Sequence, residues 1–406
     1  MKGVLLSVSI LLSISVAAQE LLNRDSLLRL LPQSRDSARV ELLIQIGQQY
    51  EGSEPELSKQ YYRQARELSK KIGYRLGEIK FVTNYTFLLN MQGYYDSSLQ
   101  FNQEGERIAN EIRHEEYMAK TAFNTGNSYR LLEEYEKALA KYLDTYPLLE
   151  RLDNPFMMAQ ALDIIQGLYT ELKQYRRSIN YGKQAVELLR KEGHPILLAI
   201  AVNNLGMNYT KLRLYDSALI CYQESLQLSL ESENKHLESA AYLNIGDVYL
   251  KSLQYDKIES YMRKALLLSK ELGSFSSQAI AYRGISYSHF YRRQYESARK
   301  FADSSLALAL QHQLKPELQK TYAHLANLSY AVQQHQEGDQ YAIKAAEISD
   351  SLLNESIQKR TIEMDKKYQS ALKDSQISLQ QASLKVKTSW NYALTGGAAA
   401  LLLLSL

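Results

Sequence analysis

A sequence motif recurs at a fixed period through most of this 406-residue chain. Three clear copies occupy 123–142, 203–222 and 243–262, and the first of them reads FNTGNSYRLLEEYEKALAKY. A tyrosine in the middle of the motif returns at equal steps, at Tyr95, Tyr135, Tyr175, Tyr215, Tyr255 and Tyr295. A period of about 40 residues is typical of a solenoid, in which identical helical units stack and bury each other's apolar faces.

Each copy predicts two amphipathic helices joined by a short turn. In the third copy we expect the first helix over 117–132 and the second over 135–152, because apolar residues recur there three and four positions apart. Small residues occupy three columns, as closely crossing helices require. The first column holds Gly126, Gly206, Gly246, Ser286 and Ala326. The second holds Ser58, Ser98, Ala138, Ser178, Ala218, Ala298 and Gly338, with Ile258 as its one large member. The third holds Ala65, Gly105, Thr145, Ala185, Ser225, Ala265, Ser305 and Ala345.

These columns indicate eight copies over residues 38–349, and helix-end signals fall in the same register. Gly73, Gly193 and Gly273 lie a whole number of repeats from one another, where a helix C-terminus favours a left-handed residue. Pro155 and Pro195 follow in register and are expected to open the next helices.

The motif N-x-G-x-x-Y followed by Y-[DE]-x-A-[LI]-x-x-[YF] resembles the tetratricopeptide repeat (TPR). The resemblance covers about three quarters of the chain, and it departs from the family in length, since the usual unit has about 34 residues. It implies an all-α fold, a right-handed α-solenoid of about eight helix-turn-helix repeats.

The N-terminal residues predict export. Residues 1–18 contain Lys2, an apolar stretch and a Val16-x-Ala18 site, the layout of a secretory signal peptide. The alternative is an uncleaved anchor, although the apolar stretch is short for a membrane span. Residues 19–37 are expected to form a capping helix at the exposed end of the solenoid.

Beyond the repeats the helical pattern continues without glycine or proline. Residues 350–389 predict a long helix with a weak heptad seam that starts at Ile357, Thr361, Met364 and Tyr368, and pairing through it would give a homodimer. The alternative is a single solvated helix. Residues 390–406 carry no charge and read as the first part of a transmembrane helix that the sequence truncates.

Composition and motifs argue against several functions. The net charge is only +3 with both signs interspersed, which argues against nucleic-acid binding. We find no nucleotide-binding, kinase or hydrolase motif, so no catalytic residue is proposed and the chain is expected not to be an enzyme. The seven histidines lack ligand spacing, so no metal and no cofactor are expected. The single Cys221 reads as a small buried hydrophobe.

One set of polar residues stands out on the first helices. Asparagine lies two residues before the glycine column at Asn84, Asn124, Asn204 and Asn244. The resemblance implies that these helices line a concave groove and that such an asparagine grips the backbone of a peptide ligand, a task that suits an amide because it donates and accepts. Further groove candidates are Lys80, Lys120, Asn127, Arg130, Lys211 and Lys251, which favour an acidic peptide or a carboxylate terminus. The alternative is that asparagine pairs with the neighbouring helix.

The order of segments is similar to the extracytoplasmic half of bacterial TPR-containing sensor histidine kinases and membrane-anchored regulators. It implies a periplasmic solenoid that binds a protein or peptide, anchored in the inner membrane by its C-terminal helix, as the sensory part of a signal-transduction protein such as a two-component system. The alternative is a stand-alone envelope scaffold that assembles other proteins.

Overall fold

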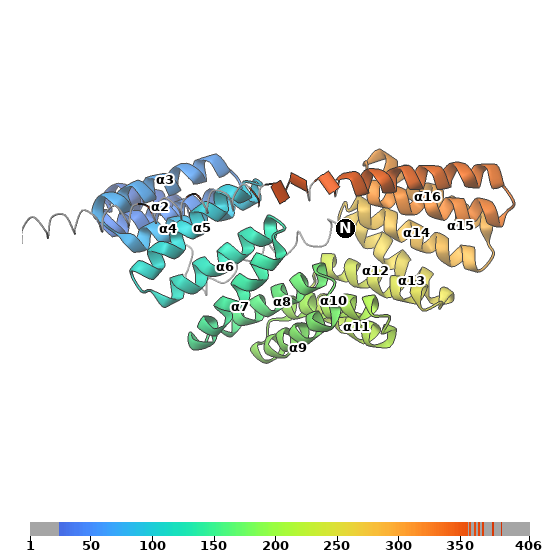
Figure 1. Cartoon of the computed structure of the whole chain (residues 1–406), viewed down its shortest axis with the longest axis horizontal. Helices are drawn as coiled ribbons and strands as arrows, with labels where there is room; N and C mark the ends of the chain where they lie inside the picture. Colours follow the sequence, from blue (N-terminus) through green and yellow to red (C-terminus); the bar gives the residue numbers. More distant parts are fainter. Residues whose placement is uncertain are drawn as a thin grey trace, which may run out of the picture. The chain divides into compact units, whose positions relative to one another are not determined.

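The computed structural model describes residues 24–355 and scattered positions between 357 and 383, and this part of the chain is helical without a strand (Figure 1). It divides into two compact units between Phe301 and Ala302, and each unit is described by itself. The helices, with one 3-10 turn η3, are α1 (Arg24–Leu30), η3 (Leu31–Gln33), α2 (Asp36–Tyr50), α3 (Pro55–Ile72), α4 (Arg75–Met91), α5 (Tyr95–Glu111), α6 (Glu115–Leu131), α7 (Tyr135–Arg151), α8 (Pro155–Glu171), α9 (Tyr175–Glu192), α10 (Pro195–Lys211), α11 (Tyr215–Glu231), α12 (Lys235–Lys251), α13 (Tyr255–Glu271), α14 (Phe275–Tyr291), α15 (Tyr295–Gln311) and α16 (Lys315–Ala331). Residues 335–355 are helical as well.

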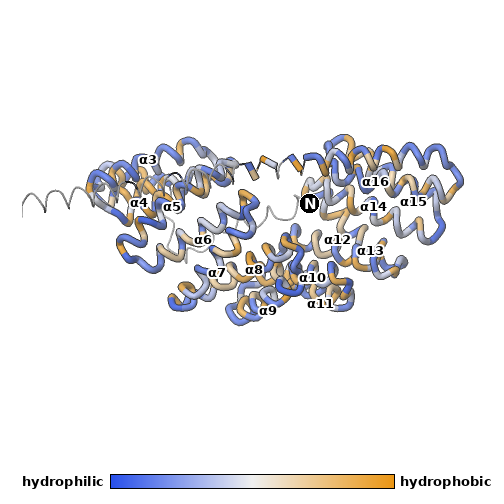
Figure 2. The backbone as a smooth tube through the Cα atoms, viewed as in Figure 1, coloured by the Kyte–Doolittle hydropathy of each residue, from blue (hydrophilic) through white to orange (hydrophobic). Residues whose placement is uncertain are grey.

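The prediction of an all-helical repeat solenoid is confirmed. From α2 to α13 an even-numbered first helix packs on the odd-numbered second helix that follows it, and the pair recurs with the period of the sequence motif. In the third copy the observed helices α6 and α7 begin and end within two residues of the expected ones. Figure 2 shows apolar and polar residues interspersed along each helix, as amphipathic helices require.

The small columns lie where helices of one repeat cross. A Cβ atom added to Gly126 would stand 3.0 Å from the ring of Tyr142, and one added to Gly206 would stand 2.8 Å from the ring of Tyr222. Ala218, in the second column, is fully buried. The columns therefore act as packing sites, since a larger side chain would collide with the partner helix.

The helix ends reveal a regularity that the sequence shows only in part. Gly73, Gly193 and Gly273 adopt left-handed backbone with φ of 71°, 72° and 64°, as expected. Pro155 and Pro195 open α8 and α10, also as expected. Other residues take the same conformation where glycine is missing, one after each of the remaining helices from α5 to α16: Arg113, Glu133, Asp153, Lys173, Arg213, Glu233, Leu253, Arg293, Gln313 and Gln333.

First and second helices differ in their neighbours. From α4 to α12, each first helix contacts its own second helix, the preceding second helix and, in most repeats, the next first helix. The second helices make no comparable contact with each other. The first helices therefore form the inner row of the stack. The approach of α6 to α8 is the exception, because these two helices make fewer contacts than the other consecutive first helices.

The unit that starts at Ala302 continues the repeat. Ser305 and Thr321 share a buried hydrogen bond of 3.0 Å, and Tyr322 of α16 stacks on Tyr341 with ring centroids 5.9 Å apart. Lys315 forms an ion pair with Glu355. The end of α15, α16 and the helix at 335–355 thus pack on one another as the repeat columns predict.

Several expectations on the chain ends fall outside the described residues. These are the signal peptide at 1–18 and the membrane span at 390–406. In the described part, no helix has the length and apolar character that a membrane crossing requires. Helix α1 and the turn η3, which contains Pro32, lie where the capping helix was expected. Ile357, Met364 and Tyr368 of the heptad seam are helical and exposed, and dimerisation through them remains a prediction.

Candidate functional site

The four asparagines of the sequence prediction lie in line on α4, α6, α10 and α12, all partly exposed. We call the strip of first-helix surface that carries them the amide row. Its members are Asn84, Asn124, Asp163, Asn203, Asn204 and Asn244.

Three of the four asparagines make hydrogen bonds to a neighbouring first helix. Asn204 donates its Nδ2 to Oδ1 of Asp163 at 3.2 Å, and Asn244 donates to Oδ1 of Asn203 at 2.8 Å. The Oδ1 of Asn84 accepts from Gln48 at 2.8 Å. These bonds are the helix-to-helix pairing that the alternative interpretation describes, so the amide row contributes to packing between repeats.

Asn124 differs from the other three. Its side chain is half-buried on α6 and makes no hydrogen bond to any residue of the described part, although its backbone carbonyl accepts from Asn102 at 3.3 Å. The neighbouring first helix α8, which approaches α6 least closely, places Ile164 in the asparagine column. The Asn124 amide therefore keeps a donor and an acceptor for a ligand.

Asp163 belongs to the site and was missed in the sequence. Burial raises its pKa from 3.8 to about 6, against the lowering effects of the Asn204 hydrogen bond and the nearby positive charge of Arg130. With the Gln166 amide oriented to satisfy both of its ends, Nε2 of Gln166 also donates to Asp163 at 3.3 Å. The signal was available, since the residues one repeat before and one repeat after Asp163 are uncharged Phe123 and Asn203.

The predicted basic residues of the groove are less free than expected. Lys80 forms an ion pair with Glu41 at 2.7 Å, Lys120 pairs with Glu116 at 3.3 Å, and Lys251 pairs with Asp247. These carboxylates come from the same helix or the preceding first helix, and they reduce the positive charge of the face.

The remaining three candidates are divided. Asn127 is buried, and its Oδ1 accepts from the hydroxyl of Tyr142 at 2.7 Å, so it belongs to the core. Arg130 is partly exposed, and its Nε is buried without a hydrogen-bond partner in the described residues. Lys211 is exposed and has no ion pair within that part of the chain. Asn124, Arg130 and Lys211 are therefore the predicted site residues with spare capacity for a ligand.

Other chemistry finds little support in the described residues. No group of histidine, cysteine and carboxylate side chains there has the geometry to hold a metal ion. Cys221 is buried, and burial raises the pKa of its thiol to about 11, which keeps it protonated and unreactive.

Comparison with known proteins agrees with this architecture. Residues 196–266 match the family model described as Tetratricopeptide repeat. A search of curated proteins by sequence gives no match. The matched residues lie between α10 and α13, and the same helix pair recurs on both sides of them in the described residues.

Several solved structures have a similar fold. The apo form of RapI is 14% identical, with 78% of this chain and 98% of that chain covered at a TM-score of 0.58. Aspartyl phosphate phosphatase F from Bacillus subtilis is 15% identical, with coverage of 82% and 95% and a TM-score of 0.57. A Signal Transduction ATPase with Numerous Domains protein with a tetratricopeptide repeat sensor, from Pyrococcus horikoshii, is 17% identical. The similarity covers 84% of this chain and 55% of that protein, with a TM-score of 0.61. Identities this low show a common fold.

Proposed function

We propose that this chain is a protein-interaction module whose amide row binds a peptide segment of a partner protein. The observation that carries the proposal is the unpaired amide of Asn124, at the place where α6 and α8 are least closely packed. A peptide backbone offers alternating donors and acceptors, which one amide can engage at both ends. Arg130 of α6 and Lys211 of α10 supply positive charge on the first helices and favour a segment with a carboxylate.

The structural similarities support binding and not catalysis. The fold is a scaffold of paired helices, and a fold of this kind does not by itself carry an activity. The likeness to aspartyl phosphate phosphatase F is a likeness of fold at 15% identity, so its activity is not transferred.

The wider role that we propose is the sensory part of a bacterial signal-transduction protein. The sequence supports it through the predicted signal peptide at 1–18 and the predicted membrane span at 390–406, which would hold the repeats outside the cytoplasm. A stand-alone envelope scaffold would use the same amide row to assemble other proteins. Fractionation of cells, with N-terminal sequencing that starts at Gln19, would support export, whereas a retained Met1 in the cytoplasm would contradict it.

The binding proposal is tested with peptides selected against the full chain from a random displayed library. Asn124→Ala should weaken the selected peptide about three- to tenfold, the effect of about one hydrogen bond. Its melting temperature should stay unchanged, because the amide makes no bond inside the protein.

Asn244→Ala is the matched control, because it removes the same side chain where the amide already bonds to Asn203. It should lower the melting temperature and affect the affinity less. The proposal fails if Asn124→Ala binds the peptides as tightly as the unmodified chain does.

A further inference from the structure

One junction between repeats replaces apolar packing by charges. Glu106 of α5 contacts Lys141 of α7 across the groove between two successive second helices. In later copies of the repeat, the positions that correspond to Glu106 are Tyr146, Val186, Leu226 and Leu266. The positions that correspond to Lys141 are Phe101, Tyr181, Cys221, Tyr261 and Phe301.

At the later junctions of residues 24–301, the residues that correspond to Glu106 and Lys141 belong to apolar clusters. At the first junction, Arg66 lies over the ring of Phe101. A carboxylate and an ammonium in this position cost desolvation, because they lie where the repeat elsewhere buries hydrophobic side chains. The junction between the second and third repeats is thus specialised.

The Glu106 carboxylate is only half satisfied. Its Oε2 accepts from Nζ of Lys141 at 2.6 Å, while its Oε1 is buried without a hydrogen-bond partner in the described residues. The side chain as a whole is 19% exposed. A buried acceptor without a donor is unfavourable by about 1–3 kcal/mol, so this atom favours a bound group that donates.

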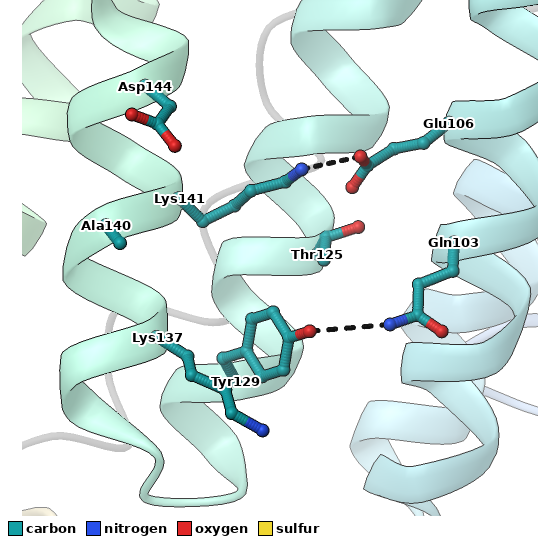
Figure 3. A pocket seen from close by; sticks show the side chains of 8 residues that line it. All are labelled: Gln103, Glu106, Thr125, Tyr129, Lys137, Ala140, Lys141 and Asp144. Carbon is teal, nitrogen blue, oxygen red and sulfur yellow. Dashed lines mark hydrogen bonds and ion pairs between the residues drawn. The ribbon is translucent and has the colours of Figure 1, made fainter. Parts of the chain in front are cut away.

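A cavity of about 320 Å³ adjoins the carboxylate (Figure 3). Helix α5 contributes Glu106 and Gln103, and α6 contributes Tyr129 and Thr125. Helix α7 contributes Lys137, Ala140, Lys141 and Asp144. The cavity is of a size for one side chain or a small molecule. It lies on the side of the second helices, apart from the amide row.

The nitrogen donors that line this cavity each have a partner. Lys141 donates to Glu106, and Nε2 of Gln103 donates to the Tyr129 hydroxyl at 3.4 Å, as Figure 3 shows. Nζ of Lys137 lies 2.8 Å from a Glu134 oxygen and 5.4 Å from the centre of the Tyr129 ring.

Two carboxylate groups at this cavity have acceptor oxygens without a partner in the described residues. Oε1 of Glu106 has no partner, and the exposed carboxylate of Asp144 makes no ion pair or hydrogen bond with the described residues. These unpaired carboxylate oxygens suit a ligand that brings donors and positive charge.

We propose that this cavity binds a guanidinium or alkylammonium group, with Glu106 accepting from it and Asp144 at the rim contributing a second negative charge. Two sources have this chemistry: a free cationic amine, and an arginine or lysine side chain of a docked protein. The site is independent of the amide row and goes beyond the proposed function.

The test is an NMR titration of the full chain with L-argininamide and with its uncharged analogue L-citrullinamide. We expect argininamide to bind at least tenfold more tightly. Glu106→Gln should weaken argininamide about tenfold or more, the effect of one charge-assisted hydrogen bond. Asp144→Asn, at an exposed position, should weaken it about threefold.

Glu104→Gln is the matched control. Glu104 lies on the same helix and bridges to the preceding second helix through Arg66 at 2.8 Å, outside the cavity. It should leave the affinity unchanged. A tripeptide Gly-Arg-Gly that binds more tightly than argininamide would point to a protein side chain, and equal affinities would point to a free amine. The proposal is overturned if argininamide does not bind, if citrullinamide binds equally, or if Glu104→Gln weakens binding as much as Glu106→Gln.

Discussion

The first helices of the repeats form one row and the second helices another. Both rows are built from the same repeat unit, yet their polar residues make different interactions. On the first helices, side chains of the amide row hydrogen-bond from helix to helix, as Asn204 does to Asp163 and Asn244 to Asn203. On the second helices, charged side chains face solvent and form ion pairs such as Arg190 with Glu224.

The difference follows from the number of neighbours. A first helix is packed by two second helices and by adjacent first helices, so only a narrow strip of it remains for polar groups. A second helix leaves a whole face in water, where charges contribute little to stability. A polar residue on a first helix therefore carries information about pairing or binding, and one on a second helix usually does not. Glu106 is informative because it occupies a packing position.

The largest expected effect is in the core that both rows share. Tyr142 is fully buried, packs at 5.1 Å on the ring of Phe123 and lies against Gly126. Tyr142→Ala should lower the free energy of unfolding by about 3–5 kcal/mol through the cavity that it leaves. Tyr146→Ala, four residues further on α7 and partly exposed, should cost clearly less in the same urea titration. Equal losses would show that full burial does not set Tyr142 apart from the partly exposed Tyr146.

A smaller loss is expected from overpacking a small column. Ala218 has no exposed surface, so Ala218→Leu should destabilise by about 1–3 kcal/mol. Hydrogen exchange should speed up mainly in the adjoining repeats, because each repeat contacts only its neighbours. Gln223→Leu, on the exposed face of the same helix, should change stability by about 0.5 kcal/mol or less. Faster exchange spread evenly over all repeats would argue against a solenoid.

A third prediction concerns the pH dependence of stability that Asp163 gives to the amide row. Because the pKa of Asp163 is about 6 in the folded chain and 3.8 ordinarily, the folded state binds this proton more tightly than the unfolded state. Its contribution to stability should fall as pH rises from about 4 to about 6 and stay level above that. Asp163→Asn should remove this slope from urea unfolding measured between pH 4 and 7. An unchanged slope would place the titrating group elsewhere.

The smallest effect is expected on the second-helix row. Arg190 and Glu224 lie 2.5 Å apart between α9 and α11, with both side chains at least one third exposed. Glu224→Gln should reduce stability by about 0.2–1 kcal/mol at low salt, and the loss should shrink at high salt. Denaturant midpoints at two salt concentrations measure it. A large loss that salt does not reduce would contradict the solvated character of this row.

The sequence predicted the fold well because packing is repetitive. Gly126, Ala138 and Ala218 could be recognised as crossing points since the same requirement returns in every copy. The left-handed backbone at Leu253 and Glu133 could not be predicted, because the surrounding turn can hold any residue in that conformation. Only glycine signals it in the sequence.

The site was harder to predict than the fold. The asparagine column correctly marks first helices, but residue identity does not say whether the amide of Asn204 faces a neighbour or a ligand. Asn127 was assigned to the groove, and its bond to Tyr142 places it in the core. Glu106 and Asp163 were overlooked. Each is a charge in a column that most other repeats fill with uncharged residues, with Arg66 and Arg283 as the exceptions, and this signal is visible only when the copies are compared position by position.

The central claim is that partners bind the first-helix row, and photo-crosslinking tests it most directly. Benzoylphenylalanine is placed at exposed Lys120 or Lys211 on the first helices, and at exposed Gln184 or Gln223 on the second helices, each in the full chain with a library-selected peptide. The account predicts crosslinks to the peptide from Lys120 and Lys211 only. Crosslinks from Gln184 or Gln223, with none from the first helices, would contradict it.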